Sequence, residues 1–203
     1  MAPARRSGAQ TRAEIQRVAL DLFTRRGYEA TSLREIADAL GINKASLYYY
    51  FPGKESILQS LFARRGDEAE ALLSWLEEQP PSPDLLEHAV LRWVESFSAD
   101  KLHGIRFLAA NPRLSGELGG AEGERIGEGL DRVAARLTPV LDDPTPSDAL
   151  LIRMALLSIN FAVEAAAGTE SSDEEILSAA RTAARTLVGE LLASRSADAA
   201  RSS

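Results

Sequence analysis

Residues 31–58 read TSLREIADALGINKASLYYYFPGKESIL, and this stretch decides the fold. Ser32 followed by Glu35 three residues later is a capping box, which marks the start of a helix. The apolar residues after it recur at helical spacing and define one buried face: Leu33, Ile36, Ala37 and Leu40. Gly41 ends the helix, because glycine readily adopts the left-handed backbone conformation found at helix C-termini. The pattern therefore predicts a short helix over about 32–40.

A second short helix follows after the four-residue turn Leu40–Asn43. Asn43 caps a helix over 44–50, and Pro52 with Gly53 ends it. Three apolar residues are expected to hold the two helices together: Ile42, Leu47 and Phe51. Two short helices at this spacing predict a helix-turn-helix, whose second helix enters the major groove of DNA.

The predicted second helix leaves an unusual set of side chains facing outward. They are Lys44, Ala45, Ser46, Tyr48 and Tyr49. Tyrosine hydroxyls can donate to phosphate oxygens, and tyrosine rings can pack on sugars and thymine methyl groups. Lys54, at the start of the next helix, can also reach a phosphate. The alternative is that the tyrosines pack against that next helix, and we expect this in part for Tyr50.

This part of the sequence resembles the DNA-binding signature of the TetR family of bacterial regulators. The resemblance rests on T-S-x-R-E-I-A, on G-I-N-K-A-S-L-Y-Y-Y-F and on the K-E soon after, and it covers about residues 11–58. By this resemblance, the residues that contact DNA are Thr31, Ser32, Arg34, Asn43, Lys44, Ala45, Ser46, Tyr48, Tyr49 and Lys54. The family often has histidine where Tyr50 stands and glycine where Ala45 stands, which bears on base preference rather than on the fold. The resemblance also implies a homodimer on double-stranded, palindromic operator DNA and a C-terminal domain that binds a small molecule.

The rest of the chain predicts further helices separated by proline- and glycine-rich breaks. Seven more are expected, nine in all, over 11–26, 54–78, 83–97, 100–110, 124–141, 147–167 and 172–194. Pro112 and four glycines predict a flexible loop over 111–123. We therefore expect an all-α protein. A helix-turn-helix domain at 9–53 would be joined by a long helix to a ligand-binding and dimerisation domain at 54–197.

The composition of this 203-residue chain argues against several classes of site. It has no cysteine, so disulfides, thiolate metal sites and cysteine nucleophiles are excluded, and its only histidines are His88 and His103. No nucleophile–base set, metal-ligand spacing or glycine-rich phosphate loop occurs, so neither an enzyme nor a metal or cofactor is expected. No apolar run approaches the ~18 residues of a membrane span, and the start does not read as a signal peptide. A cytoplasmic protein is therefore expected.

The net charge of −7 argues against nucleic-acid binding until its distribution is considered. Residues 1–60 contain nine Lys/Arg and six Asp/Glu, a balance of +3, whereas the remainder contains 14 and 24, a balance of −10. A basic first part on an acidic body is typical of a regulator with one DNA-facing end. Arg5, Arg6 and Arg12 either form a solvated arm or add phosphate or minor-groove contacts.

The last two predicted helices carry apolar residues on more than one face, as helices would that touch both their own core and a partner. We expect a homodimer through the helices near 147–168 and 172–194, and the alternative is an internal hairpin of a monomer. Asn160 and Glu164, four residues apart on a largely apolar helix, indicate polar groups in a ligand pocket. The candidate pocket residues are Trp93, Phe97, Phe107, Met154, Asn160, Phe161 and Glu164.

The function expected from these patterns is a repressor that leaves a palindromic operator when a small-molecule effector binds. The effector would act through the helix at 54–78 and change the separation of two reading helices, which must be about 34 Å. The alternative is a TetR-like DNA-binding protein without a ligand, which acts through oligomerisation or protein contacts. A filled C-terminal core would favour that alternative.

Overall fold

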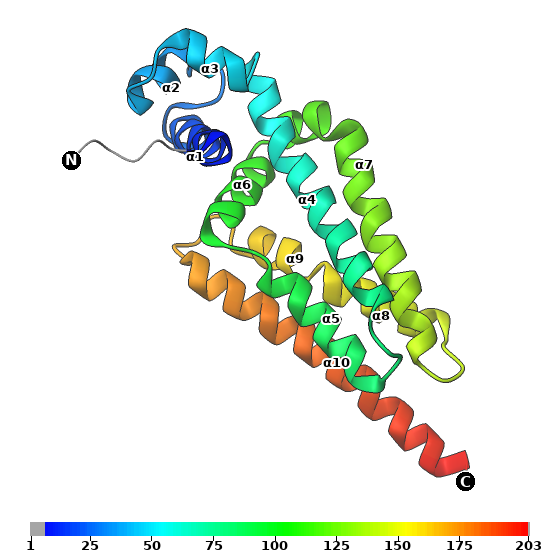
Figure 1. Ribbon diagram of the computed structural model, residues 1–203. Coiled ribbons are helices and arrows are strands. Elements are labelled where there is room, and N and C mark those ends of the chain that lie inside the picture. The colour runs from blue at the N-terminus through cyan, green and yellow to red at the C-terminus, as the bar shows by residue number, and fades with distance from the viewer. Residues whose placement is uncertain (1–6, 203) are drawn as a thin grey trace, which may run out of the picture.

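The computed structural model describes residues 7–202, and this part of the chain contains helices and loops but no strand (Figure 1). The helices are α1 (Gly8–Arg26), α2 (Leu33–Leu40), α3 (Lys44–Tyr50), α4 (Lys54–Glu77), α5 (Pro83–Glu95), α6 (Ala99–Ala110), α7 (Pro112–Leu137), α8 (Pro146–Leu156), α9 (Ser158–Ala165) and α10 (Asp173–Ser202). A 3₁₀ turn, η1 (Thr138–Val140), follows α7. The all-α prediction is confirmed. Arg5 and Arg6 lie outside the described residues.

The N-terminal unit, α1–α3, forms where the capping signals predict. Ser32 and Glu35 make the capping box of α2, and Gly41 ends that helix in the left-handed region at φ 64°. A cluster of buried side chains, called here the N-terminal core, holds the three helices: Ile15, Ala19, Leu20, Phe23, Tyr28, Ile36, Ala37, Leu47, Phe51, Ile57, Leu58 and Phe107. The last three come from α4 and α6, so the unit is anchored on helices of the body. The boundary between residues 53 and 54 stays a prediction.

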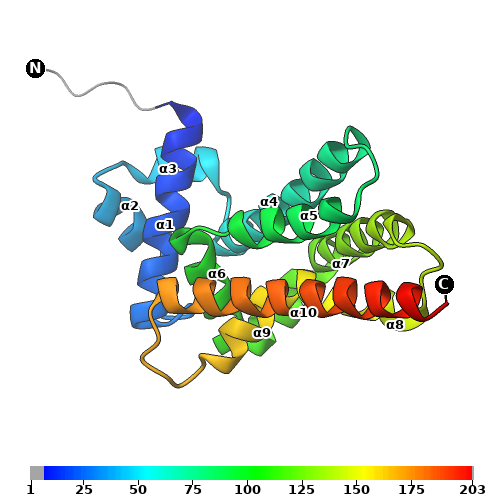
Figure 2. The ribbon, with the colours of Figure 1, turned by 90° about the horizontal axis from the view of Figure 1, so that it is seen from below.

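The body consists of α4–α10 around a second core. The long helix α4 runs from the N-terminal unit into the body beside α7, and α5 lies beside α10 (Figure 1). Seen from below, α10 extends along one side of the body and crosses α8 and α9, which pack against it (Figure 2). Trp93 on α5 donates from its indole N–H to the carbonyl oxygen of Leu156 at 3.0 Å. This bond satisfies the one polar group of a buried aromatic side chain and links α5 to the end of α8.

Two expectations about the body are wrong. Residues 112–123, expected to lie in a flexible loop, belong to α7, which begins with Pro112 at its first position. Glycine in a helix costs about 1 kcal/mol relative to alanine, and packing of α7 along α4 offsets this cost. The contact is close at Gly129, where an added Cβ would lie 2.9 Å from the Cβ of Ala69. The helix expected over 147–167 is broken at Leu157 into α8 and α9.

No helix among residues 7–202 combines the length and the apolar character that crossing a membrane requires.

A buried ion pair joins the start of α8 to the end of α10. Asp148 accepts from the backbone N–H of Thr145 at 2.8 Å and from Arg195 Nη1 at 2.6 Å, and its side chain is 10% exposed. Arg195 Nη2 also donates to the carbonyl oxygen of Asp143 at 3.1 Å. The Thr145 backbone N–H, together with its hydroxyl and Arg195, lowers the pKa of Asp148 below its ordinary value.

Replacing Asp148 with asparagine is expected to destabilise the protein at pH 7. A lowered folded-state pKa stabilises the protein above the unfolded-state value of about 3.9 and loses this effect as the pH falls through the folded value. We expect Asp148→Asn to lower Tm by roughly 2–8 °C at pH 7, with a shrinking difference below about pH 4. Thermal unfolding by circular dichroism measures this, with the exposed pair Arg185–Glu87 as the control, since Arg185→Gln should change Tm little. A pH-independent difference would contradict the assignment.

Candidate nucleic-acid interface and body cavity

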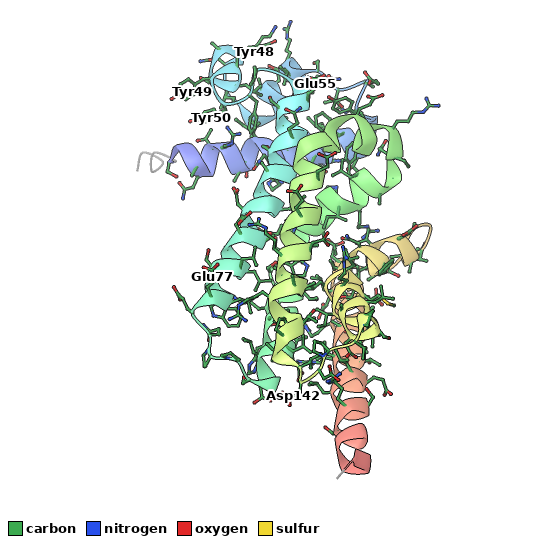
Figure 3. The ribbon with its side chains drawn as sticks, turned by 90° about the vertical axis from the view of Figure 1, so that its right-hand side faces the viewer. Tyr48, Tyr49, Tyr50, Glu55, Glu77 and Asp142 are labelled. Carbon is green, nitrogen blue, oxygen red and sulfur yellow. The ribbon has the colours of Figure 1, made fainter. Side chains whose placement is uncertain are left out.

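The orientation of α3 is fixed by two buried side chains. Leu47 and Phe51 are fully buried in the N-terminal core, and burying each contributes about 1.5–3 kcal/mol. Asn43 caps the helix through its Oδ1, which accepts from the backbone N–H of Ser46 at 2.7 Å. The opposite face is therefore turned outward, and Tyr48 and Tyr49 on it are 43% and 83% exposed. Both lie at the end of the molecule farthest from the C-terminal part of α10 (Figure 3).

The exposed face of α3 combines aromatic, hydroxyl and cationic groups. The ring of Tyr49 packs edge-on against that of Tyr50, with centroids 5.2 Å apart. Tyr50 itself is half-buried against the N-terminal core. The ammonium group of Lys44 lies 5.3 Å from the centroid of the Tyr48 ring. Ala45 is exposed between these side chains, and its small size leaves the middle of the helix open to a groove. Such a face suits the sugar, phosphate and base-edge contacts of DNA.

Two residues expected to contact DNA make contacts within the protein. Thr31 is fully buried, and its hydroxyl donates to the carbonyl oxygen of Gly27 at 2.9 Å. Its side chain therefore shapes the loop between α1 and α2, and the expectation of a DNA contact by this side chain is corrected. Lys54 donates from Nζ to the carbonyl oxygen of Tyr28 at 2.7 Å and lies 4.4 Å from the centroid of the Tyr28 ring. A phosphate contact by Lys54 stays a prediction, in competition with these bonds.

The start of α2 presents two further candidates at the surface. The Ser32 hydroxyl accepts from the backbone N–H of Glu35 at 3.2 Å and lies 2.9 Å from the Glu35 carboxylate. The backbone N–H and hydroxyl of Ser32 hold the pKa of Glu35 below its ordinary value. Arg34 is 82% exposed, with Asp38 at 3.8 Å as its ion-pair partner. The guanidinium of Arg34 therefore remains accessible to a phosphate.

Arg12 is a positioning residue whose role the sequence does not reveal. It donates from Nη1 to the backbone carbonyl oxygen of Tyr50 at 3.1 Å, and its guanidinium lies 4.2 Å from the centroid of the Phe51 ring. These contacts tie the beginning of α1 to the C-terminal end of α3, where carbonyl groups lack helical partners. The contact joins residues 38 positions apart, so no local pattern predicts it.

A cavity of about 490 Å³ lies where the N-terminal unit meets the body. Its walls come from α1 and α4–α9: Ala13, Gln16, Arg17, Leu20, Leu61, Arg64, Arg65, Trp93, Phe97, Lys101, His103, Gly104, Ile105, Leu108, Ala109, Ile126, Leu130, Leu156, Asn160, Val163 and Glu164. A volume of this size lies within the ordinary range for small-molecule sites. The contribution of α1 is unexpected from the sequence, because the predicted pocket was confined to the C-terminal domain.

The structure divides the seven predicted pocket residues into two groups. Trp93, Phe97, Asn160 and Glu164 line the cavity, whereas Phe107, Met154 and Phe161 do not. Phe107 is buried in the N-terminal core, 6.0 Å from Phe23 between ring centroids. Met154 and Phe161 point to the surface and are 39% and 54% exposed. Apolar residues on one helix can face either a cavity or solvent, and periodicity alone does not separate the two.

The cavity has a cationic wall on α4 and α6 that the sequence does not indicate. Arg65 stacks on two aromatic rings, with its guanidinium carbon 4.2 Å from the Trp93 centroid and 3.6 Å from the Phe97 centroid. Burial lowers the pKa of Arg65 to about 10, which leaves the side chain charged at neutral pH. Arg64 and Lys101 line the same cavity.

The N-terminal unit and the body are also connected by polar contacts beside the cavity. Gln16 on α1 donates from Nε2 to the hydroxyl of Ser60 on α4 at 2.6 Å. The hydroxyl oxygen of Thr24, also on α1, lies 3.0 Å from Nε2 of His103 on α6. Gln16 and His103 both line the cavity, so an occupant would touch residues that position α1.

Comparison with known proteins finds sequence matches to bacterial transcription regulators over part of the chain. Residues 15–61 match the profile described as "Bacterial regulatory proteins, tetR family". The HTH-type transcriptional repressor BepR of Brucella suis biovar 1 is 28% identical over 155 residues, which are 74% of this chain and 66% of that protein. The HTH-type transcriptional regulator RutR of Escherichia coli is 33% identical over 110 residues, 52% of each chain. The matched part thus spans between half and two thirds of these relatives.

Solved structures share the fold at lower identity. AmtR from Mycobacterium smegmatis superposes with a TM-score of 0.59 at 24% identity, over 97% of each chain. PfmR from Thermus thermophilus, a TetR family transcriptional regulator, superposes with a TM-score of 0.59 at 23% identity, over 86% of this chain and 96% of that one. These likenesses support the whole-chain architecture, N-terminal unit and body together.

Proposed function

We propose that the chain is a TetR-family regulator, a dimeric transcription repressor that leaves its operator when a small molecule fills the body cavity. The proposal of DNA binding rests on the side chains that α3 exposes to solvent. Leu47 and Phe51 fix that helix in the N-terminal core, while Tyr48 and Tyr49 remain free to contact DNA. Such a protein acts where the bacterial chromosome lies, in the cytoplasm.

Exposed apolar side chains on α8 and α9 support the dimer. Leu150, Met154 and Phe161 are 58%, 39% and 54% exposed, although the surrounding helices are well packed. Large exposed apolar side chains on neighbouring helices are typical of a protein interface. An isologous contact through α8–α10 would relate two α3 helices by a two-fold axis, as a palindromic operator requires.

The position of the cavity supports a direct route from ligand to DNA-binding unit. Its wall includes α1, which carries part of the N-terminal core, and α4, which joins that unit to the body. An occupant that pushes Gln16 or His103 alters how α1 sits on α4 and α6. A ligand that fits only the altered arrangement would shift the population away from the DNA-binding one, by no more than its preference for that state.

The second candidate is a regulator that has no small-molecule ligand. A filled C-terminal core would favour it, and a cavity of about 490 Å³ lined by both apolar and charged side chains favours the ligand-responsive regulator instead.

Selection of bound sequences from a random DNA pool tests the proposal. We expect the full chain to enrich one palindromic sequence with half-sites about one helical turn apart. A gel-shift titration with the enriched sequence and a scrambled duplex then gives the specificity ratio at a stated salt concentration. Enrichment of no sequence, or of half-sites without two-fold symmetry, would contradict the proposal.

The two lysines near α3 are expected to differ in their effect on operator affinity. Lys44 is exposed at the start of α3, whereas Lys54 is bonded to Tyr28. Lys44→Ala should weaken binding to all sequences and reduce the slope of log K against log salt by about one, the value for one phosphate contact. Lys54→Ala should change that slope by the same amount only if Lys54 leaves Tyr28 to reach a phosphate. An unchanged slope for Lys44→Ala would remove Lys44 from the interface.

A further inference from the structure

Three cations on one side of the cavity pair with the same carboxylate. Glu68 lies 3.7 Å from Arg64 Nε and 2.6 Å from Lys101 Nζ, and it also pairs with Arg65. Arg64, Arg65 and Lys101 line the cavity, whereas Glu68 is not among the lining residues. Among the ion pairs of the described residues, these three positive charges meet one negative charge, so this wall carries an excess of positive charge.

Arg65 is incompletely bonded for a buried cation. Its side chain is 11% exposed, and its Nη2 has no acceptor among the described residues. A buried donor without an acceptor costs free energy, and the cost is larger when the donor is charged. The two aromatic rings on which Arg65 stacks interact with its charge but accept no conventional hydrogen bond. An anion bound at this wall would supply an acceptor after a small rotation of the guanidinium.

The remaining walls are mainly apolar. They include Leu20 on α1, Leu61 on α4, Phe97 between α5 and α6, Ile105 on α6, Leu130 on α7 and Val163 on α9. Glu164 is the one carboxylate among the lining residues, against four Lys and Arg side chains. A ligand that fills this space therefore meets hydrocarbon over most of its surface and positive charge at one side.

We propose that the cavity binds an amphipathic anion, whose carboxylate or other anionic group lies against Arg64, Arg65 and Lys101 and whose apolar body lies on Leu20, Leu61 and Phe97. The inference rests on the proposed function in that this anion is the small molecule that releases the operator. A cation would meet like charges at the wall, and a neutral ligand would leave their excess charge unpaired. The negative group thus decides which ligands bind.

Calorimetric titration of the full chain, without DNA, tests the class of ligand. The probes are decanoate, decyl sulfate and decyltrimethylammonium below their critical micelle concentrations and decanol below its solubility limit, with naphthaleneacetate and naphthaleneethanol as an aromatic pair. Among probes with the same hydrocarbon group, the anion is expected to bind at least about tenfold more tightly than the neutral or cationic analogue. Tenfold is the factor for one charged hydrogen bond. Equal affinities within both series, or binding of none of the probes, would overturn the proposal.

Charge-changing variants then test the wall itself. Lys101→Gln is expected to weaken binding of the preferred anion about tenfold, whereas Glu68→Gln should strengthen it because the cations lose their competing carboxylate. Arg132→Gln, which removes the same charge from an exposed pair with Glu70 outside the cavity, should change affinity little. Circular dichroism confirms that each variant is folded. If Lys101→Gln weakens decanol as much as decanoate, the wall acts by shape rather than charge and the proposal is wrong.

Adding operator DNA separates the two proposals. If the anion binds, responds to the variants and leaves the operator complex intact, the cavity assignment stands and the release mechanism fails. If the protein binds its palindromic operator but none of the anions, the DNA-binding function stands and the assignment of the ligand fails.

Discussion

Glutamate at Phe161 or Leu150 is expected to convert the protein to a monomer and to weaken operator binding at least about 100-fold. Both side chains are more than half exposed in the single chain, so a charge there costs little in the monomer. In a dimer through α8–α10 the same charge would be buried without a partner, which costs several kcal/mol. A monomer holds one α3 helix and loses the gain from binding two half-sites together.

Size-exclusion chromatography with light scattering measures the mass, and gel shifts measure the operator affinity. Ala71→Glu serves as the matched control, because Ala71 is exposed on α4 and is expected to lie away from the dimer contact. We expect the control to remain dimeric and to bind DNA normally. If the Phe161→Glu and Leu150→Glu proteins both keep the dimer mass, α8 and α9 are excluded from the interface.

Alanine at Tyr49 is expected to weaken operator binding by about tenfold to 100-fold while leaving Tm nearly unchanged. The side chain is 83% exposed and contacts the ring of Tyr50, so its removal should cost the fold little. On DNA it would lose contacts to a base edge or phosphate, which are worth about 1–3 kcal/mol. Tyr48→Ala should act in the same direction, with a further effect through Lys44.

A phenylalanine variant separates the parts of the tyrosine. If the hydroxyl of Tyr49 bonds a phosphate, Tyr49→Phe should lose nearly as much affinity as Tyr49→Ala. If the ring packs on a sugar or a thymine methyl group, Tyr49→Phe should bind almost as tightly as the unchanged protein. Full operator affinity in both alanine variants would remove α3 from the reading position, whatever the fold of the N-terminal unit.

The N-terminal unit is predictable from the sequence because its determinants are local. Ser32 and Glu35 are three residues apart, and Gly41 must adopt a positive φ at the end of α2. Leu47 and Phe51 lie four residues apart on one side of α3 and are both fully buried. In each case the residues that decide the structure lie within one or two helical turns of one another.

The cavity is not predictable in this way, because its walls depend on contacts between distant helices. Arg65 and Lys101 occupy positions that a helical pattern assigns to solvent, yet they are 11% and 15% exposed. The helical state of residues 112–123 depends on packing of α7 along α4. The burial of Thr31 is not predictable from the motif either. Its hydroxyl donates to the carbonyl oxygens of Leu22 and Gly27, which precede the helix-turn-helix in the sequence.

Leu20 belongs to two structures at once, the N-terminal core and the wall of the cavity. A smaller residue there would enlarge the space for a ligand and would also remove packing from the unit that holds α3. A substitution of Leu20 that changes ligand preference would therefore also destabilise the DNA-binding unit. Ile105 and Leu130 line the cavity but are outside the N-terminal core, so substitutions there would not have this effect. As such a protein diverges, we therefore expect substitutions that change ligand specificity to occur on α6 and α7 before they occur on α1.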